Sequence, residues 1–389
     1  MKTYNLQFWL LCLSSYLFFA SFNMIIPELP DYLRSLGGED YLGLYISLFT
    51  LTAGLSRPFS GKLTDRIGRI PVMVFGAGVC FVIGFLYPVL SSVGGFLFLR
   101  FIHGFSTGFK PTGTVAYVAD IVPYEKRGEA MGLAGVFGTM GMASGPALGS
   151  FIADSISLDA MFYSSSAFAI LSVIILLGMK ETLKDREKLQ WEHLKINWQD
   201  VFDKSVIKPS IVMVLNTFSF GIVLTIIPDL TAQMDIGNNG IAFLIFTLAS
   251  LIVRLAAGRA SDRFGREPIL LISSFLYSMG MFVIGVADSK ALFIVGNIIF
   301  GIAVGMNSPT IFAWATDLSS ALHRGRAMAT VFIALEIGIM LGSFISGIIY
   351  DNNPEHFTKT FWMGGVVAFT SFLYLSFLII HKKIRYESV

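Results

Sequence analysis

The sequence predicts an all-α membrane protein with twelve transmembrane helices arranged as two six-helix repeats. Of the 389 residues, 54% are hydrophobic and only 14% are charged, whereas a soluble domain has about 25% charged residues. Apolar runs long enough to cross about 30 Å of hydrocarbon follow one another along the chain. In addition, the polar segment GKLTDRIGRIPV at 61–72 returns as GRASDRFGREPI at 258–269, as expected for a duplicated unit.

The apolar runs fall into two sets of six, and each run is predicted to form one transmembrane helix. The first set lies near residues 6–27, 42–60, 70–90, 96–119, 129–152 and 161–179, and the second near 207–228, 240–258, 268–287, 291–315, 327–349 and 361–381. A shift of 197 residues carries Asp65 onto Asp262 and Gly104 onto Gly301. We therefore predict an N-terminal six-helix bundle at 1–180, a cytoplasmic linker at 181–206 and a C-terminal six-helix bundle at 207–389.

Basic residues predict the orientation of the chain in the membrane. They concentrate in the connections on the side that holds both termini, and only Arg34, Lys290 and Lys359 fall on the other side. By the positive-inside rule, both termini are cytoplasmic in a multi-pass protein of the cytoplasmic (inner) membrane. The net charge of +2 gives no indication of a nucleic-acid partner. The two cysteines, Cys12 and Cys80, lie within apolar runs and exclude a disulfide framework or a cysteine zinc site.

The repeated polar segment predicts a cytoplasmic gate. Gly61 and Gly68 permit tight turns, and Asp65 requires a cationic or helix-N-terminal partner, which the start of the eleventh helix would supply. A merely solvated basic turn is the alternative. The predicted gate residues are Gly61, Asp65, Arg66, Gly68, Arg69, Asp120 and Arg127, together with Asp262, Arg263, Arg266, Asp317 and Arg324 in the second half.

The fourth helix carries three cations inside a predicted span. Arg100, His103 and Lys110 fall within an arc of about 80°, and the repeat breaks at Arg100 and Lys110, which become Asn297 and Asn307. Charges in a span are costly and tend to face a cavity or a partner, so we predict that these positions belong to a proton-coupling site or a substrate cavity. Alternatively, Arg100 snorkels or pairs structurally, and His103 is a packing histidine.

Acidic residues inside the predicted membrane are few. Glu336, in the eleventh helix, is the one carboxylate that hydropathy places near the midplane, where it either titrates during transport or forms a static ion pair with a residue such as Lys110. Three further acids follow the first and seventh helices. Glu28, Asp31 and Asp229 are therefore expected to be wet gate residues at the outer mouth.

The fifth helix is rich in small residues and reads GVFGTMGMASGPALGS at 135–150. Small residues let helices approach closely. Pro146 can kink a span when a neighbouring group satisfies the freed carbonyl. The matched helix of the second half retains glycines but has Ser343 in place of the proline.

Taken together, these features resemble the major facilitator superfamily over essentially the whole chain. They are the twelve spans in two halves, the long central cytoplasmic loop, and G-x-L-x-D-R-x-G-R between helices two and three, echoed between eight and nine. The resemblance implies a rocker-switch transporter whose substrate site lies between the halves near the midplane.

Two shorter motifs add to the resemblance. Arg100, with Gly104 and Gly108, resembles the fourth-helix motif of the superfamily, in which the arginine is linked to proton coupling. The set Gly141, Gly145, Pro146 and Gly149 resembles G-x-x-x-G-P-x-x-G, a motif found mainly in antiporters and exporters. Ser150 departs from this pattern, because a second glycine is usual there.

We therefore predict a proton-driven antiporter that exports a small amphiphilic or drug-like molecule, acts as a monomer in membrane lipid, and uses the proton gradient rather than a cofactor. No Walker A pattern occurs, and no nucleophile, base and orienting group of an enzyme is recognisable. One alternative keeps the fold and imports a sugar or an anionic metabolite. The other is a non-transporting membrane sensor or scaffold.

Overall fold

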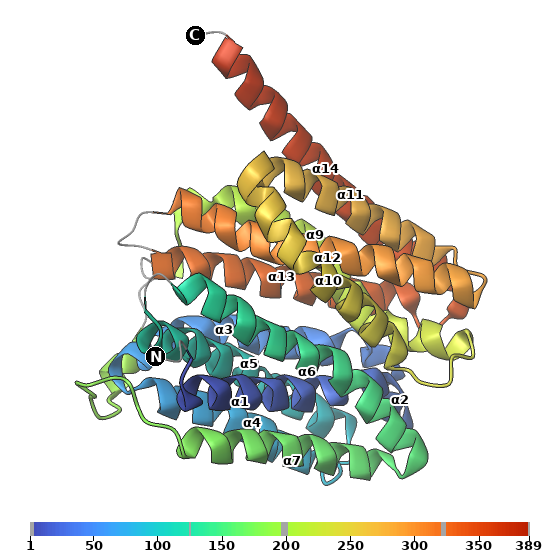
Figure 1. Cartoon of the computed structure of the whole chain (residues 1–389). Helices are drawn as coiled ribbons and strands as arrows, with labels where there is room; N and C mark the ends of the chain where they lie inside the picture. The colour runs from blue at the N-terminus through green and yellow to red at the C-terminus, as the bar shows by residue number, and fades with distance from the viewer. Residues whose placement is uncertain (1–3, 124–125, 196–200, 320–323, 388–389) are drawn as a thin grey trace. The chain divides into compact units, whose positions relative to one another are not determined.

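The computed structural model describes residues 4–123, 126–195, 201–319 and 324–387, and these residues are mainly helical (Figure 1). The long helices of the first half are α1 (Leu6–Met24), α3 (Leu44–Arg66), α4 (Arg69–Leu86), α5 (Val93–Ile121), α6 (Arg127–Ser155) and α7 (Leu158–Leu177). Those of the second half are α9 (Ile207–Gln233), α10 (Ile241–Phe264), α11 (Arg266–Gly285), α12 (Lys290–Leu318), α13 (Arg324–Tyr350) and α14 (Phe357–Glu387). A short helix, α2 (Leu29–Ser35), extends the first span after a 3₁₀ turn at Ile26–Glu28.

Most of these long helices are apolar enough to cross a membrane. In the described residues, nine helices meet that requirement by length and composition, or ten if the bent pair within α10 is one span. Helices α3 and α5 are not among them, and both carry charged residues, including Lys62 and Asp65 in α3 and Arg100 and Lys110 in α5.

The same packing pattern occurs in both halves. Helix α1 packs against α6 and α7, and α4 packs against α5 and α7. In the second half, α9 packs against α13 and α14, and α11 packs against α12 and α14. The pattern therefore repeats helix for helix, as the shared sequence offset predicts.

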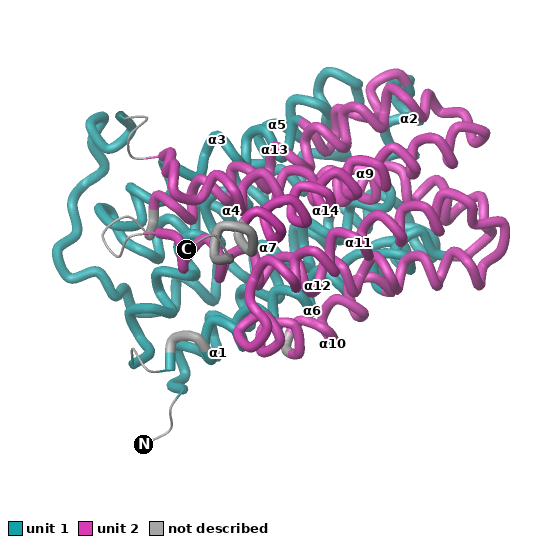
Figure 2. The backbone as a smooth tube through the Cα atoms, turned by 90° about the horizontal axis from the view of Figure 1, so that it is seen from above, with its two compact units in different colours: residues 1–39, 48–200, 238–244 teal, residues 40–47, 201–237, 245–389 magenta. Residues whose placement is uncertain are grey.

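The chain forms two compact units (Figure 2). Unit 1 comprises residues 1–39, 48–200 and 238–244, and unit 2 comprises residues 40–47, 201–237 and 245–389. The described part of the predicted linker is thus divided, because residues 181–195 belong to unit 1 and residues 201–206 to unit 2. The first residues of α3 belong to unit 2, and those of α10 to unit 1.

The starts of the helices follow from local sequence. Asn5, Ser92, Ser157 and Ser289 each accept a backbone N–H of the first turn of the following helix, which satisfies one of the unpaired donors there. Helices α4 and α11 instead follow Gly68 and Gly265, whose φ angles are +123° and +94°. Only glycine adopts such angles without strain.

Candidate functional site

The predicted gate segments form the ends of helices rather than a loop. Residues Gly61 to Arg66 are the last turns of α3, and only Ile67 and Gly68 separate α3 from α4. An added Cβ at Gly61 would meet nothing within 4 Å. The tight turn that we expected at Gly61 is therefore absent, because the α-helix continues through it and Gly68 alone makes the turn.

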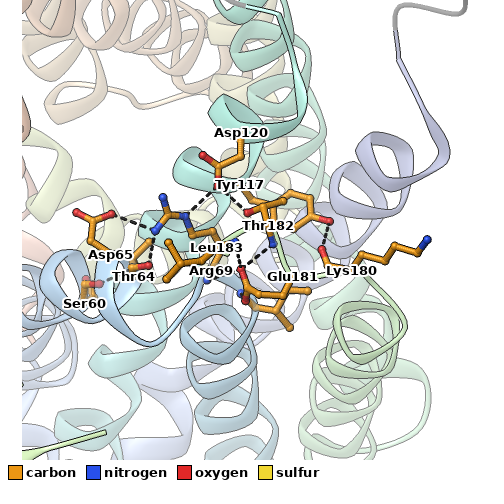
Figure 3. A network of polar contacts seen from close by, with 11 residues as sticks. Ser60, Thr64, Asp65, Arg69, Tyr117, Asp120, Lys180, Glu181, Thr182 and Leu183 are labelled. Carbon is orange, nitrogen blue, oxygen red and sulfur yellow. Dashed lines mark hydrogen bonds and ion pairs between the residues drawn. The ribbon is translucent and has the colours of Figure 1, made fainter. Parts of the chain in front are cut away.

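Arg69, at the first turn of α4, joins the predicted acids of the gate (Figure 3). Its Nε donates to Asp120 Oδ2 at 3.0 Å, and its Nη1 donates to Asp65 Oδ1 at 3.2 Å and to the Thr64 carbonyl at 2.5 Å. The Arg69 side chain is only 13% exposed, whereas that of Asp65 is 75% exposed. The arginine is thus held by two carboxylates, one of which remains open to a further partner.

Sequence reasoning missed the carboxylate that caps α4. Glu181 follows α7, and its two oxygens accept the backbone N–H groups of Arg69 at 3.1 Å and Ile70 at 3.0 Å (Figure 3). A Cβ at Gly68 would lie 2.5 Å from Glu181 Oε2. A carboxylate at a helix N-terminus is favoured by the helix dipole. The only sequence signal for this contact is a lone acid directly after the sixth span.

The described linker is attached to the same helix ends. Arg66 Nη1 lies 2.6 Å from Glu187 Oε1, and His193 Nε2 lies 2.7 Å from Glu187 Oε2. Lys62 Nζ donates to the carbonyls of Glu192 and Lys195, at 2.9 Å each. The hydrogen bond from Arg66, and secondly that from His193, lower the pKa of the Glu187 carboxyl below its usual value.

The second half repeats the arginine cluster. Arg266 Nε donates to Asp317 Oδ2 at 2.8 Å, and Arg266 also forms an ion pair with Asp262. Arg263 lies over the ring of Phe264, at 5.3 Å from its centroid. The side chains of the two remaining predicted gate residues, Arg127 and Arg324, lie outside the described part of the chain.

The three cations of α5 are buried in unit 1. Arg100 is 1% exposed, and its guanidinium lies 4.6 Å from the centroid of the Phe49 ring. His103 and Lys110 are 0% exposed. The Arg100 side chain therefore does not reach an exposed position.

Lys110 and its counterpart in the second half form matched bridges. Lys110 Nζ donates to Ser15 Oγ at 2.9 Å, so the bridge joins α5 to α1. In unit 2, Asn216 Nδ2 donates to Asn307 Oδ1 at 2.8 Å and joins α9 to α12. Both bridges join the first and fourth helices of their half. The amide of Asn297, which matches Arg100, donates to the carbonyl of Phe293 at 2.8 Å.

The predicted acids have different environments. Glu336, in α13, is 6% exposed and is buried in unit 2. Glu28 is also 6% exposed and accepts hydrogen bonds from Ser150 Oγ at 2.5 Å and Asn239 Nδ2 at 3.4 Å. Our expectation that Glu28 is wet is therefore wrong, because the 3₁₀ turn that holds Glu28 packs against α6.

The other two acids of the expected outer mouth are less enclosed. Asp31 is exposed and pairs with Arg34 at 2.9 Å. Asp229 is half-buried within α9.

The glycines of α6 form a close seam with α1. An added Cβ at Gly141 would lie 2.5 Å from the Tyr16 carbonyl oxygen, and one at Gly145 would lie 2.6 Å from that of Ala20. Gly149 faces the Met24 carbonyl even more closely. Pro146 is buried inside α6 between these glycines. Ser150, the departure from the glycine motif, is used to bind Glu28.

Sequence comparisons identify relatives of known name. The chain is 27% identical over 365 residues to the quinolone resistance protein NorA of Staphylococcus aureus, covering 90% of this chain and 92% of the relative. It is 27% identical over 351 residues to the multi-drug resistance efflux pump PmrA of Streptococcus pneumoniae, covering 84% of this chain and 86% of the relative.

Solved structures share the fold. A D-xylose-proton symporter matches with a TM-score of 0.78 and 18% identity, covering 95% of this chain and 96% of that one. The human organic anion transporter MFSD10 matches with a TM-score of 0.74 and 19% identity, covering 96% of this chain and 100% of that one. The model of the Major Facilitator Superfamily matches both halves, at residues 11–213 and 209–387. This multi-pass membrane protein is therefore a transporter that belongs to the Major Facilitator Superfamily.

Proposed function

We propose that the protein is a proton-coupled antiporter of the cytoplasmic (inner) membrane, with both termini cytoplasmic, that exports small amphiphilic compounds. The proton gradient is its energy source, and its partners are the substrate, protons and lipid. It works as a monomer through alternating access.

The observation that carries the proposal is the burial of ionisable side chains in both units. Arg100 and Lys110 are at most 1% exposed in unit 1, and Glu336 is 6% exposed in unit 2. Charged groups inside a membrane protein are costly to bury and are retained mainly where ions, protons or substrates move. Because an arginine stays protonated, Glu336 and Lys110 are the members of this set that can exchange a proton, and Glu336 is the one carboxylate among them.

The direction of transport rests on separate support. The names of two relatives describe quinolone resistance and multidrug efflux, and the motif at Gly141, Gly145, Pro146 and Gly149 resembles one found mainly in exporters. We therefore take a quinolone as the first probe substrate.

We also propose that the two arginine clusters form a cytoplasmic latch. Asp65 of the first cluster would bind the N-terminal end of α13, and Asp262 of the second would bind the N-terminal end of α6. Helix N-termini attract negatively charged groups. The 75% and 69% exposure of these two carboxylates leaves room for such a partner.

Substitution of Glu336 tests the coupling role. Glu336→Gln keeps the shape of the side chain but cannot release a proton, so we expect it to abolish gradient-driven transport while leaving substrate binding measurable. Glu355→Gln is the control, because Glu355 is exposed in the turn before α14. Transport would be followed in proteoliposomes of known orientation with an imposed pH gradient and an internal pH reporter.

Two results would overturn the proposal. Full gradient-driven turnover by Glu336→Gln would remove Glu336 from the coupling site. Uptake of an anion or a sugar in the same direction as protons would show an importer, and attention would then move to Arg100, His103 and Lys110 as a substrate site.

A further inference from the structure

A buried chain of hydrogen bonds crosses unit 1 and ends on Arg100. The successive donor–acceptor distances are 3.3 Å, 3.1 Å, 3.3 Å, 3.2 Å and 2.7 Å. Every member of the chain is at most 1% exposed. In order, the groups are Arg100 Nη1, Tyr87 Oη, His103 Nδ1 and Nε2, Cys80 Sγ, Ser21 Oγ and the Ser165 carbonyl.

The groups at the two ends of this chain of hydrogen bonds determine which atom donates in each bond. Arg100 can only donate, so Tyr87 Oη accepts from it and directs its own proton to His103 Nδ1. At the other end, Ser21 donates to the Ser165 carbonyl, which leaves Ser21 Oγ to accept from the Cys80 thiol. In this arrangement each proton has an acceptor.

His103 therefore carries its proton on Nε2 and donates it to Cys80 Sγ. A proton on Nδ1 would face Tyr87 Oη, and the tyrosine proton would then lose the acceptor that this chain gives it. We assign the neutral Nε2–H tautomer on this network.

The second half of the protein provides an internal control for this arrangement. The offset of 197 matches His103 with Phe300 and Cys80 with Tyr277. Phe300 and Tyr277 meet edge to face, with ring centroids 5.3 Å apart. The same helix seam is thus built in unit 2 from an aromatic contact.

The aromatic neighbour of this pair is also repeated. Phe49 meets His103 edge to face at 5.5 Å in unit 1, and its counterpart Phe246 meets Phe300 edge to face at 5.7 Å in unit 2. Packing alone therefore does not require the imidazole or the thiol. A buried polar network is costly unless every member is satisfied. Its presence in unit 1, where packing does not require it, points to a function for these hydrogen bonds.

We propose that Tyr87 and His103 are positioning residues for Arg100. Tyr87, at the C-terminal end of α4, accepts a hydrogen bond from one guanidinium nitrogen of Arg100. The Phe49 ring lies against the same guanidinium. His103 in turn fixes the direction of the Tyr87 hydroxyl, and Cys80 fixes the tautomer of His103. The inference rests on the proposed function, in which Arg100 takes part in proton coupling.

Two variants test the role in transport. Tyr87→Phe removes one oxygen, and His103→Phe installs the side chain that the second half uses at the matched position. Tyr277→Phe is the control, because it removes a hydroxyl from the corresponding seam of unit 2. Each variant removes a strong hydrogen bond of the network that ends on a charged group, so we expect gradient-driven turnover at saturating quinolone to fall about tenfold or more. The substrate KM should stay within about twofold of the parent value, and Tyr277→Phe should change neither quantity.

A spectroscopic measurement tests the geometry without any transport. In protein labelled with ¹⁵N-histidine, the His103 signals are identified by their loss in His103→Phe. We expect shifts of a neutral Nε2–H ring, and a change at Nδ1 in Tyr87→Phe because its donor is removed.

The outcomes separate the two proposals. No gradient-driven transport by the parent protein would contradict the proposed function. Normal turnover in folded Tyr87→Phe would overturn the positioning role, and so would an Nδ1–H or doubly protonated ring at His103. If His103→Phe fails to fold, Tyr87→Phe and the Nδ1 signal still decide the question.

Discussion

The seam between α1 and α6 gives a quantitative prediction, because two glycines of the same helix differ sharply in their surroundings. A methyl group added at Gly145 would lie 2.6 Å from the Ala20 carbonyl oxygen and 3.1 Å from its Cα. At Gly135, the added methyl group would meet nothing within 4 Å. The obstacle at Gly145 is backbone, which cannot rotate away.

These surroundings predict opposite effects of the same substitution. Overpacking costs about 1–3 kcal/mol, and alanine regains at most about 1 kcal/mol of helix propensity. Because the obstacle at Gly145 is backbone at 2.6 Å, we take the upper part of that range, about 2–3 kcal/mol, and expect Gly145→Ala to destabilise the protein by about 1–2 kcal/mol net. Gly135→Ala should be neutral or should stabilise it by up to about 1 kcal/mol.

Thermal unfolding of the two purified variants in one detergent measures this difference. For a unit of about 200 residues, a change of 1 kcal/mol shifts Tm by about 2–4 °C, so the variants should differ by several degrees. Equal Tm values would refute the close seam, and the motif glycines would then need an explanation other than packing. If the seam is correct, parallel transport assays will show whether the loss of stability also slows turnover.

Three further predictions concern the gate. Glu181→Gln should destabilise the start of α4 by about 1 kcal/mol because the dipole loses its carboxylate, and a Tm no lower than that of Glu355→Gln would count against the cap. The pKa of the Glu187 carboxyl is lowered in the folded protein. The stability that this carboxylate contributes is therefore fully present above the ordinary glutamate pKa, and it is lost as pH falls through the lowered pKa. Limited proteolysis of the linker should therefore accelerate at acidic pH in the parent protein, and an identical acceleration in Glu187→Gln would contradict this origin. Asp65→Asn should slow the conformational cycle without changing substrate preference, and full turnover would remove Asp65 from the latch.

Much of the fold was predictable because its causes are local or repeated. Hydropathy reports the length of each apolar segment, and the offset of 197 between Asp65 and Asp262 reports the duplication. The pairings of Arg69 with Asp120 and of Arg266 with Asp317 occur at the same places in the two halves. A motif that repeats with its surroundings keeps its geometry.

The contacts that the sequence did not reveal depend on tertiary structure. Glu181 meets Arg69 from a position 112 residues away, and nothing in the local pattern selects that acid. Tyr87, Cys80 and Ser21 look like ordinary residues of apolar spans, because hydropathy does not record what a side chain faces. Glu28 was assigned to water for a related reason, since its place after a span does not show that Ser150 and Asn239 enclose it.

The most direct test of proton-coupled export is quinolone transport by the purified protein in proteoliposomes with an imposed pH gradient and an internal pH reporter. The account predicts that quinolone leaves the cytoplasmic side while protons move the opposite way, and that both fluxes stop in Glu336→Gln but persist in Glu355→Gln. Quinolone flux that is unaffected by collapse of the gradient, or that runs in the same direction as protons, would contradict it.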